Sequence, residues 1–362
     1  MPLPHPVSAR GGEVHRPGPE PARGPSRPSV GVPARRGAVR RVRRGECPMK
    51  ALRVVATSVA SAVPTLILAT FIVFFLQRLI PGDPAVALAG DYATPERLAE
   101  IRADLGLNEP LLQQYLSWLG GALTGDLGQS FRTGQPVADL VFERLPLTLI
   151  LTGLALLVAV AIGLPAGVLA AQRAESRFDK FLTTAATLGI AIPNFWLGMM
   201  LIVVFALQLG WLPGPGGPSL ADDPAEAMRG LVMPAVALGA VGAAEIARQV
   251  RSAMIENLSA DYVRTHRAKG LPSRSIIWKH ALKNSSLPFA TILGIQVSRL
   301  IGSAVVVEAV FGLSGLGSLV VEATNQRDYT VIQAVVFVAA ALVLLTNLIV
   351  DISYRILDPR IA

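Results

Sequence analysis

The residues whose types and spacing could serve a molecular function gather in a basic segment between Ser259 and Pro288. Ser259 is a candidate N-cap, Asp261 lies in the expected first turn, and Gly270 is placed to end a short helix. Pro272 opens a second helix after it. A rigid helix-turn-helix of this kind suits contact with a soluble partner. An amphipathic loop lying on anionic lipid is the alternative.

A second group of polar side chains falls within or beside long apolar stretches: Asn194, Glu245, Arg299 and Glu308. Ionisable side chains are costly in lipid, so in a membrane such residues line a polar pathway or pair with one another between helices. We name these four as candidates for the lining of a pathway. For Arg299 the pairing role is the preferred interpretation.

The sequence holds no pattern typical of an enzyme. None of its lysines follows a glycine, so it lacks the Gly-rich loop ending in Gly-Lys-Ser/Thr that cradles the phosphates of ATP. His266 and His280 look too isolated for a metal site, and Cys47 is the single cysteine. We therefore expect no catalytic residue, no metal and no bound cofactor in this chain.

The composition is that of a membrane protein. Hydrophobic residues make up 52% of the 362 residues and charged residues only 16%, whereas soluble domains carry roughly 25% charged residues. Such a chain cannot cover itself with polar surface, and lipid is the solvent that accepts the excess. The formal net charge of +8 then indicates basic cytoplasmic loops rather than a nucleic-acid partner.

Six apolar segments can each cross a bilayer, because a spanning helix needs about 20 mainly apolar residues. These segments are residues 54–78, 146–171, 181–209, 231–250, 286–310 and 329–352. Pro193, Pro165 and Pro234 are placed to kink three of them. Gly163 and Gly167 form a small-xxx-small pair suited to close helix packing.

Basic loops alternate along the chain with acidic or mixed loops. The basic segments are residues 35–53, 173–180, 248–283 and 355–360, and the acidic or mixed ones are 83–143 and 222–226. By the positive-inside rule the basic loops face the cytoplasm. This predicts a multi-pass protein of the inner membrane with both termini cytoplasmic.

Two further segments flank the first predicted span. Residues 1–48 are rich in Pro, Arg and Gly, which predicts a disordered extension. Met49 is the expected start of translation, and a basic cytoplasmic arm is the alternative. Residues 80–144 predict a small outer cap, with one helix from Thr94-Pro95 to Gly106 and another from Pro110 to Gly120-Gly121.

The basic segment also carries a family resemblance. It contains the run Asp261-Tyr262-Val263-Arg264-Thr265-His266-Arg267-Ala268-Lys269-Gly270-Leu271, followed by Lys279-His280-Ala281 and Leu287-Pro288. This resembles the "EAA" loop of binding-protein-dependent ABC importer permeases, in the form found in the first permease of the dipeptide, oligopeptide and nickel branch. Pro81-Gly82-Asp83-Pro84, Gly125-Asp126-Leu127-Gly128 and Val307-Glu308-Ala309-Val310-Phe311 extend the resemblance over residues 50–362.

The resemblance implies an all-α integral membrane fold of the ABC importer type I kind, with cytoplasmic coupling helices in residues 251–285 and a permease domain in 49–362. It implies docking to an ATP-binding subunit through Asp261, Tyr262, Arg264, Thr265, His266, Arg267, Ala268, Lys269, Gly270 and Leu271. Arg264-Thr265-His266 stands where the wider superfamily has Glu-Ala-Ala. His266 is unexpected there, because a small residue is usual.

The same resemblance implies the partners and the activity. The chain would form half of a translocation channel with a second homologous permease, two ATP-binding subunits that use ATP and Mg, and an extracytoplasmic substrate-binding protein. The solute would be a short peptide or a related solute such as nickel. A secondary transporter driven by an ion gradient is the alternative, and it would show an inverted repeat, which the sequence does not display.

Overall fold

The computed structural model describes residues 47–79, 84–89, 94–104, 106–217 and 222–357. Within these ranges the chain is helical, and its one β-type pairing is a bridge between Gln129 and Pro136. The predicted all-α fold is confirmed. The predicted extension 1–48 lies outside the described residues except for its last two.

Long helices form at five of the six predicted spans. They are α1 (Cys47–Leu79), α5 (Val137–Gln172), α9 (Val232–Ser259), α13 (Ser286–Phe311) and α15 (Tyr329–Leu357). Among the described residues, segments of α5, α13 and α15 are long and apolar enough by themselves to cross a membrane, and α1 contributes the shorter apolar segment Val63–Leu79. Helix α9 meets the test together with α8 (Pro224–Gly230), at a bend of 40°.

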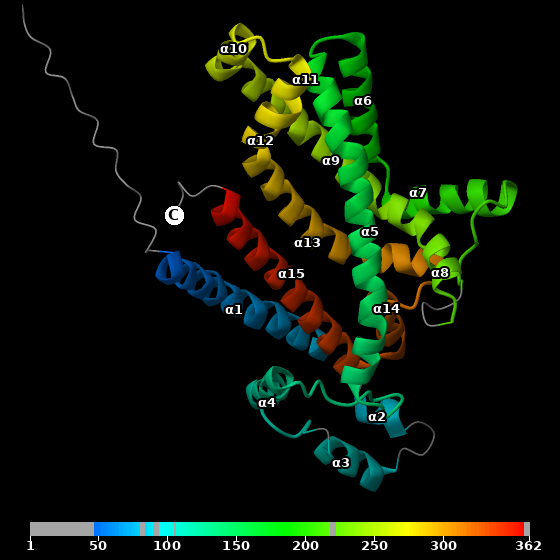
Figure 1. Ribbon diagram of the computed structural model, residues 1–362. Coiled ribbons are helices and arrows are strands. Elements are labelled where there is room, and N and C mark those ends of the chain that lie inside the picture. The colour runs from blue at the N-terminus through cyan, green and yellow to red at the C-terminus, as the bar shows by residue number, and fades with distance from the viewer. Residues whose placement is uncertain (1–46, 80–83, 90–93, 105, 218–221, 358–362) are drawn as a thin grey trace, which may run out of the picture. The chain divides into compact units, whose positions relative to one another are not determined.

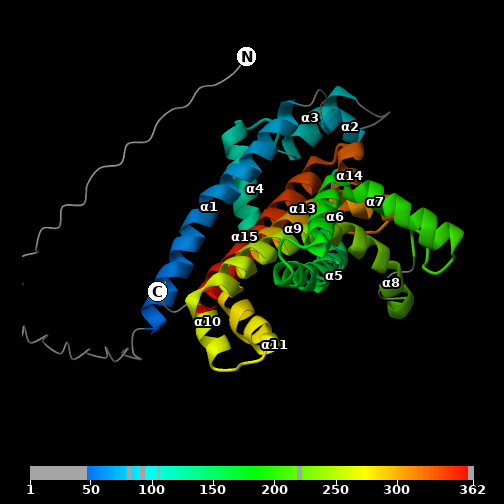
Figure 2. The same cartoon turned by 90° about the horizontal axis from the view of Figure 1, so that it is seen from above.

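The third predicted span, 181–209, is not one continuous helix. It is divided into α6 (Arg177–Ala191) and the pair α7 (Asn194–Leu201) and η2 (Ile202–Gln208), with a bend of 99° between the two parts. Ile192 and Pro193 at the break both have extended backbone, because proline has no N–H to donate and disfavours the α conformation in the residue before it. Figures 1 and 2 both show α7 pointing away from the other long helices.

Helices α5 and α9 form the centre of the fold. A Cβ placed on Gly163 or Gly167 would lie 2.5 Å from a backbone carbonyl oxygen of α9, and one on Gly239 would lie 2.4 Å from the Ala155 carbonyl oxygen of α5. The predicted small-xxx-small pair is therefore confirmed as a close contact between the two backbones. Buried side chains such as Leu151 and Leu238 fill the space beside it.

One end of the described unit carries α2 (Pro84–Ala89), α3 (Pro95–Asp104) and α4 (Leu111–Thr124). The Arg97 amide donates to Thr94 Oγ1 at 3.3 Å, as the predicted N-cap requires. The second cap helix does not stop at Gly120-Gly121 as predicted. It ends at Gly125, where φ is 94°, because glycine within a helix costs only about 1 kcal/mol while a left-handed residue ends it.

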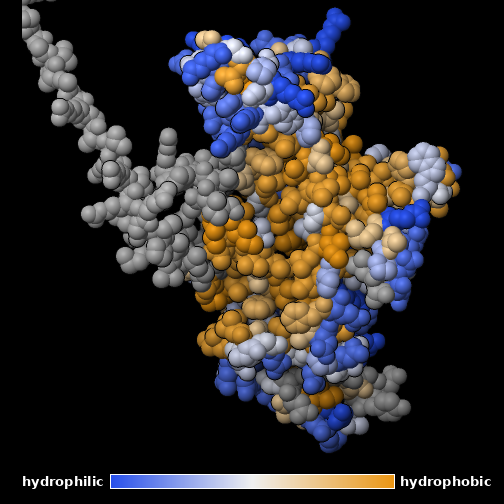
Figure 3. Space-filling model, viewed as in Figure 1, coloured by the Kyte–Doolittle hydropathy of each residue, from blue (hydrophilic) through white to orange (hydrophobic). Residues whose placement is uncertain are grey.

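The sequence did not predict α14 (Leu316–Gln326), which lies between α13 and α15. Figure 3 shows apolar side chains across the middle of the molecule, with polar residues toward the end that carries α10 and toward the end that carries α3. This is the distribution expected of a protein whose middle faces lipid.

Candidate coupling surface and translocation path

The candidate coupling surface is built from α10 (Asp261–Ala268) and the helical run α11 (Ser273–Ser275), η3 (Ile276–Ala281) and α12 (Leu282–Asn284). Two helices were predicted here, and two helical runs form. The predicted cap Ser259 is wrong by one position. Ala260 is the N-cap residue, and the Ser259 hydroxyl donates to the Glu256 carbonyl oxygen at 2.7 Å instead.

A buried polar network holds α10 in place. The Tyr262 hydroxyl donates to Asn257 Oδ1 at 3.3 Å, and Asn257 Nδ2 donates to Ser285 Oγ at 3.0 Å. Ser285 is 3% exposed, and its hydroxyl donates to the Ala281 carbonyl oxygen at 3.0 Å. Val263 on the same side of α10 is fully buried. Side chains from α9, α10 and the segment before α13 are thus tied together, and sequence reasoning had singled out neither Asn257 nor Ser285.

His266 and His280 lie side by side. The prediction that they are isolated residues is therefore wrong. Their rings stack with centroids 4.3 Å apart, and Tyr262 meets His266 edge-on at 6.0 Å. Burial first, and then the charges of His266, Lys279 and Lys283, lower the pKa of His280 below its ordinary range. The described residues contain no group of three or more His, Cys, Asp or Glu side chains that could hold a metal ion.

The outward side of this unit is basic. Exposed residues there are Asp261, Arg264, Thr265, Arg267, Ala268, Lys269 and Gly270 on the first helical run, and Arg274, Trp278, Lys279 and Lys283 on the second. Gly270 ends the first run with φ of 75°, and the half-exposed Leu271 donates its amide to the His266 carbonyl oxygen at 3.2 Å. The pair Arg264–Asp261 spans 3.6 Å with both side chains exposed, so it adds little stability and both groups stay available to a partner.

The four predicted pathway residues do not form one cluster. Arg299 Nη1 lies 2.6 Å and 2.5 Å from the two carboxylate oxygens of Glu245, and Gln296 Nε2 donates to the same carboxylate at 2.6 Å. These bonds join α9 to α13 and agree with the pairing role preferred for Arg299. Asn194 begins α7 beside the break and is half-buried, and its side chain has no hydrogen bond to the other three.

Glu308 is fully buried and is one of the residues that line a cavity of about 530 Å³, together with Arg144 and Glu322. Its carboxylate accepts from Thr148 Oγ1 at 2.7 Å and from the Gly317 and Ser318 amides at 2.7 and 3.2 Å. Glu308 therefore fixes the first turn of α14 against α5 and α13. No sequence signal indicated this, because Thr148 is 160 residues away.

An ion pair with a buried carboxylate was also missed. Asp179 is 2% exposed and accepts from Arg251 Nε at 2.5 Å and Nη2 at 2.6 Å, which joins α6 to α9. Asp179 lies inside segment 173–180, which was predicted only to be a basic loop. A carboxylate in the first turn of a helix beside a basic stretch is the signal that could have found it.

The geometry is that of a helical membrane protein with a rigid basic unit at one end, and comparison with known proteins gives its family. Residues 163–362 match the binding-protein-dependent transport system inner membrane component family, and residues 51–152 match the N-terminal membrane component of the same systems. The chain belongs to this permease family. The predicted resemblance is confirmed.

Named relatives cover most of the permease. It is 39% identical over 319 residues to the dipeptide transport system permease DppB of Alkalihalophilus pseudofirmus (83% of this chain, 96% of the relative). It is 39% identical over 331 residues to the di/tripeptide transport system permease DppB of Pseudomonas aeruginosa (86% and 98%). It is 40% identical to the oligopeptide transport system permease AppB of Bacillus subtilis (83% and 96%).

A solved structure agrees on the fold of the permease. A chain of the MetNI methionine ABC transporter, in inward-facing form, matches with a TM-score of 0.51 and 22% identity, covering 60% of this chain and 96% of that one. The protein is thus a multi-pass inner-membrane subunit of an ABC importer, the non-enzymatic component of a system that also has ATP-binding subunits and a substrate-binding protein. These relatives give no support to the gradient-driven alternative.

Proposed function

We propose that this permease is one of two homologous permeases that form the channel of an importer for short peptides. Two ATP-binding subunits on the cytoplasmic side would drive it, and a binding protein on the outer side would deliver the solute. The relatives that transport dipeptides, tripeptides or oligopeptides support the peptide class. Nickel is the competing solute within the same branch.

The proposed coupling to the ATP-binding subunits rests on how the α10–α12 unit is packed. Its outward side is basic and carries an exposed tryptophan, Trp278, while its inward side is locked by Val263 and by the network around Asn257. A force applied to α10 therefore reaches α9 and α13 without first deforming a flexible loop. Residues Asp261 to Leu271 are the proposed contact with the ATP-binding subunit, where ATP and Mg would be held.

The same proposal implies an orientation of the permease in the membrane. The basic unit lies at the end opposite α2–α4 (Figure 1), and basic loops face the cytoplasm. Both termini would then be cytoplasmic and α2–α4 would face the binding protein.

Co-purification tests the docking surface. The tagged full chain is purified from native membranes in mild detergent, and the proteins retained with it are quantified by mass spectrometry. We expect a second permease and two ATP-binding subunits per pair of permeases, and loss of the ATP-binding subunits on charge reversal by Arg267→Glu with Lys269→Glu. The matched control reverses Arg97 and Arg132, two exposed arginines at the opposite end. Equal retention by both double variants refutes the docking surface.

Transport in proteoliposomes tests the solute. The complete complex is reconstituted with its binding protein, and uptake of a radiolabelled dipeptide is followed with and without ATP. We expect ATP-dependent uptake that unlabelled peptides compete away and nickel salts do not. Uptake of ⁶³Ni²⁺ without peptide uptake would show that the solute is nickel and not a peptide. Uptake driven by an ion gradient without ATP would refute the proposal of an ATP-driven importer.

A further inference from the structure

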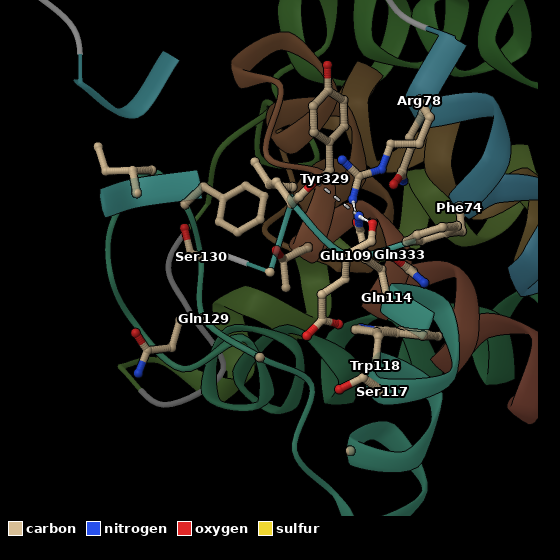
Figure 4. A pocket seen from close by; sticks show the side chains of 18 of the residues that line it. Phe74, Arg78, Glu109, Gln114, Ser117, Trp118, Gln129, Ser130, Tyr329 and Gln333 are labelled. Atoms are coloured by element: carbon tan, nitrogen blue, oxygen red, sulfur yellow. Dashed lines mark hydrogen bonds between the residues drawn. The ribbon is translucent and has the colours of Figure 1, made fainter. Parts of the chain in front are cut away.

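A second cavity, of about 830 Å³, lies between the outer ends of α1 and α15 and the cap formed by α3, α4 and the segment 126–134 (Figure 4). It shares no lining residue with the coupling surface or with the Glu245–Arg299 pair. Its polar wall on helices α1, α4 and α15 is formed by Gln77, Arg78, Gln114, Trp118 and Gln333. Two carboxylates, Glu109 and Asp126, line the cavity from the segments on either side of α4, and Arg97 lines it from α3.

Within the part of the chain that the structure describes, three hydrogen-bond donors around this cavity have no partner. Gln77 and Gln333 are 8% and 4% exposed, and neither side-chain nitrogen donates to any acceptor. The Trp118 indole nitrogen is also buried and unpaired. A buried donor that stays unsatisfied destabilises the protein, so their convergence on one cavity indicates an acceptor that the described residues do not supply. The soft terminal torsion of glutamine lets both amides turn toward a ligand at the wall.

Arg78 adds a positive charge to this wall. Its guanidinium donates to Gln114 Oε1 and lies 5.3 Å from the Phe74 ring centroid, and no carboxylate pairs with it among the described residues. Figure 4 shows Arg78 and Gln114 joined, with Tyr329, Trp118 and Gln333 around them. On the part of the wall formed by α1, α4 and α15, one cation and three unpaired donors lie together without a carboxylate. This part suits an anion that has more than one acceptor oxygen.

The exposed sides of α4 and α1 beside the cavity are apolar. On α4, Tyr115 is 2% exposed toward α1, whereas Leu112, Leu116 and Leu123 on the other side are 61%, 55% and 69% exposed. A helix with one packed side and one exposed leucine side suits the interface of a membrane better than water. Exposed Phe71, Phe75 and Leu79 continue this apolar surface along α1.

We propose that this cavity binds the phosphate of an outer-leaflet glycerophospholipid. Arg78 and the amides of Gln77 and Gln333 would donate to the phosphate oxygens, and the acyl chains would lie along the exposed sides of α1 and α4. The site would tie the cap to the bilayer, and it does not depend on which solute the importer carries.

Lipid retention tests the site. The full chain, in its complex, is purified in mild detergent, phosphatidylglycerol is added, and bound lipid is counted by native mass spectrometry. We expect one lipid that survives detergent washing, and about a tenfold weaker retention in Gln333→Leu, because this variant loses one hydrogen bond to a charged group. Gln208→Leu, which changes an exposed glutamine on η2, is the matched control and should retain lipid as the wild type does.

Two further measurements decide between explanations. Gln333→Leu removes an unpaired donor, so without lipid it should unfold at the same or a higher temperature than the wild type, which shows that the variant is folded. Arg78→Gln, which removes the charge and leaves a shorter polar side chain, should lose lipid to a similar degree. Retention of lipid by both variants overturns the proposal. The proposal is also overturned if inorganic phosphate alone raises the unfolding temperature as much as the lipid does, because the ligand would then be a free anion. It is overturned as well if the second permease or the binding protein fills the cavity in the complex and no lipid is retained.

Discussion

The ion pair between α6 and α9 allows a quantitative prediction. Asp179 accepts two bonds from Arg251 at 2.5 and 2.6 Å and one from the Glu175 amide at 2.8 Å. Asp179→Asn keeps the shape of the side chain but removes its charge, so the guanidinium loses its counter-ion. Removing one partner of a buried pair costs about 3–5 kcal/mol. Because the Arg251 side chain keeps 27% of its surface exposed, water compensates in part, and we expect a loss of about 2–3 kcal/mol in the free energy of unfolding.

A double-mutant cycle measures the coupling directly. Asp179→Asn, Arg251→Gln and the double variant are unfolded by SDS titration of mixed micelles, in the same detergent as the wild type. The expected coupling energy is about 2 kcal/mol. The exposed pair Arg97–Glu100, whose side chains are 57% and 59% exposed, serves as the control cycle and should couple by about 0.5 kcal/mol or less. Equal coupling in the two cycles, or strict additivity at Asp179 and Arg251, would refute the reasoning from burial.

Three other predictions concern the α5–α9 contact and the coupling surface. Gly163→Ala places a Cβ against the α9 backbone and should destabilise the protein by about 2 kcal/mol. Gly153→Ala on the same helix meets nothing within 4 Å and should stabilise the protein by about 0.5–1 kcal/mol. Equal melting temperatures for the two variants would contradict the close packing. Gly270→Ala keeps open space around the side chain but strains a φ of 75°, and should cost about 1–2 kcal/mol and weaken recovery of the ATP-binding subunits; unchanged recovery would argue against a fixed turn. The pKa of His280 is lowered in the folded protein, so the unfolded chain takes up a proton on this residue first as the pH falls through about 6.5. The free energy of unfolding should therefore decrease from about pH 6.5 down to the folded-state pKa. Thermal unfolding at several pH values should show this decrease in the wild type and less of it in His280→Gln, and identical pH profiles for the two proteins would contradict the prediction.

The long helices were predictable because each apolar run is bounded by charges. A gap of about 25 residues without charge, such as the one between Arg53 and Arg78, has few alternatives to a membrane helix. The cap at Thr94 and the end of α10 at Gly270 were predictable too, since capping depends on residues only a few positions apart.

What the sequence could not give depends on contacts between distant residues. The stacking of His266 on His280 needs two helices to turn back on each other, and nothing in a spacing of 14 residues indicates it. The burial of Glu308 depends on Thr148 from another helix. The break at Pro193 was predicted only as a kink, because membrane helices often accommodate proline with a small bend.

The close contact between α5 and α9 limits how the permease can move. Backbone meets backbone at Gly163, Gly167 and Gly239, so a slide of one helix along the other would drive carbonyl oxygens into neighbouring Cα atoms. We therefore predict that the two helices move together as one rigid body during transport. The accompanying rotation is expected where the chain is already interrupted, at Ile192–Pro193 and at the 40° bend before α9. Cross-links placed within this rigid body should leave transport intact, while cross-links across either interruption should stop it.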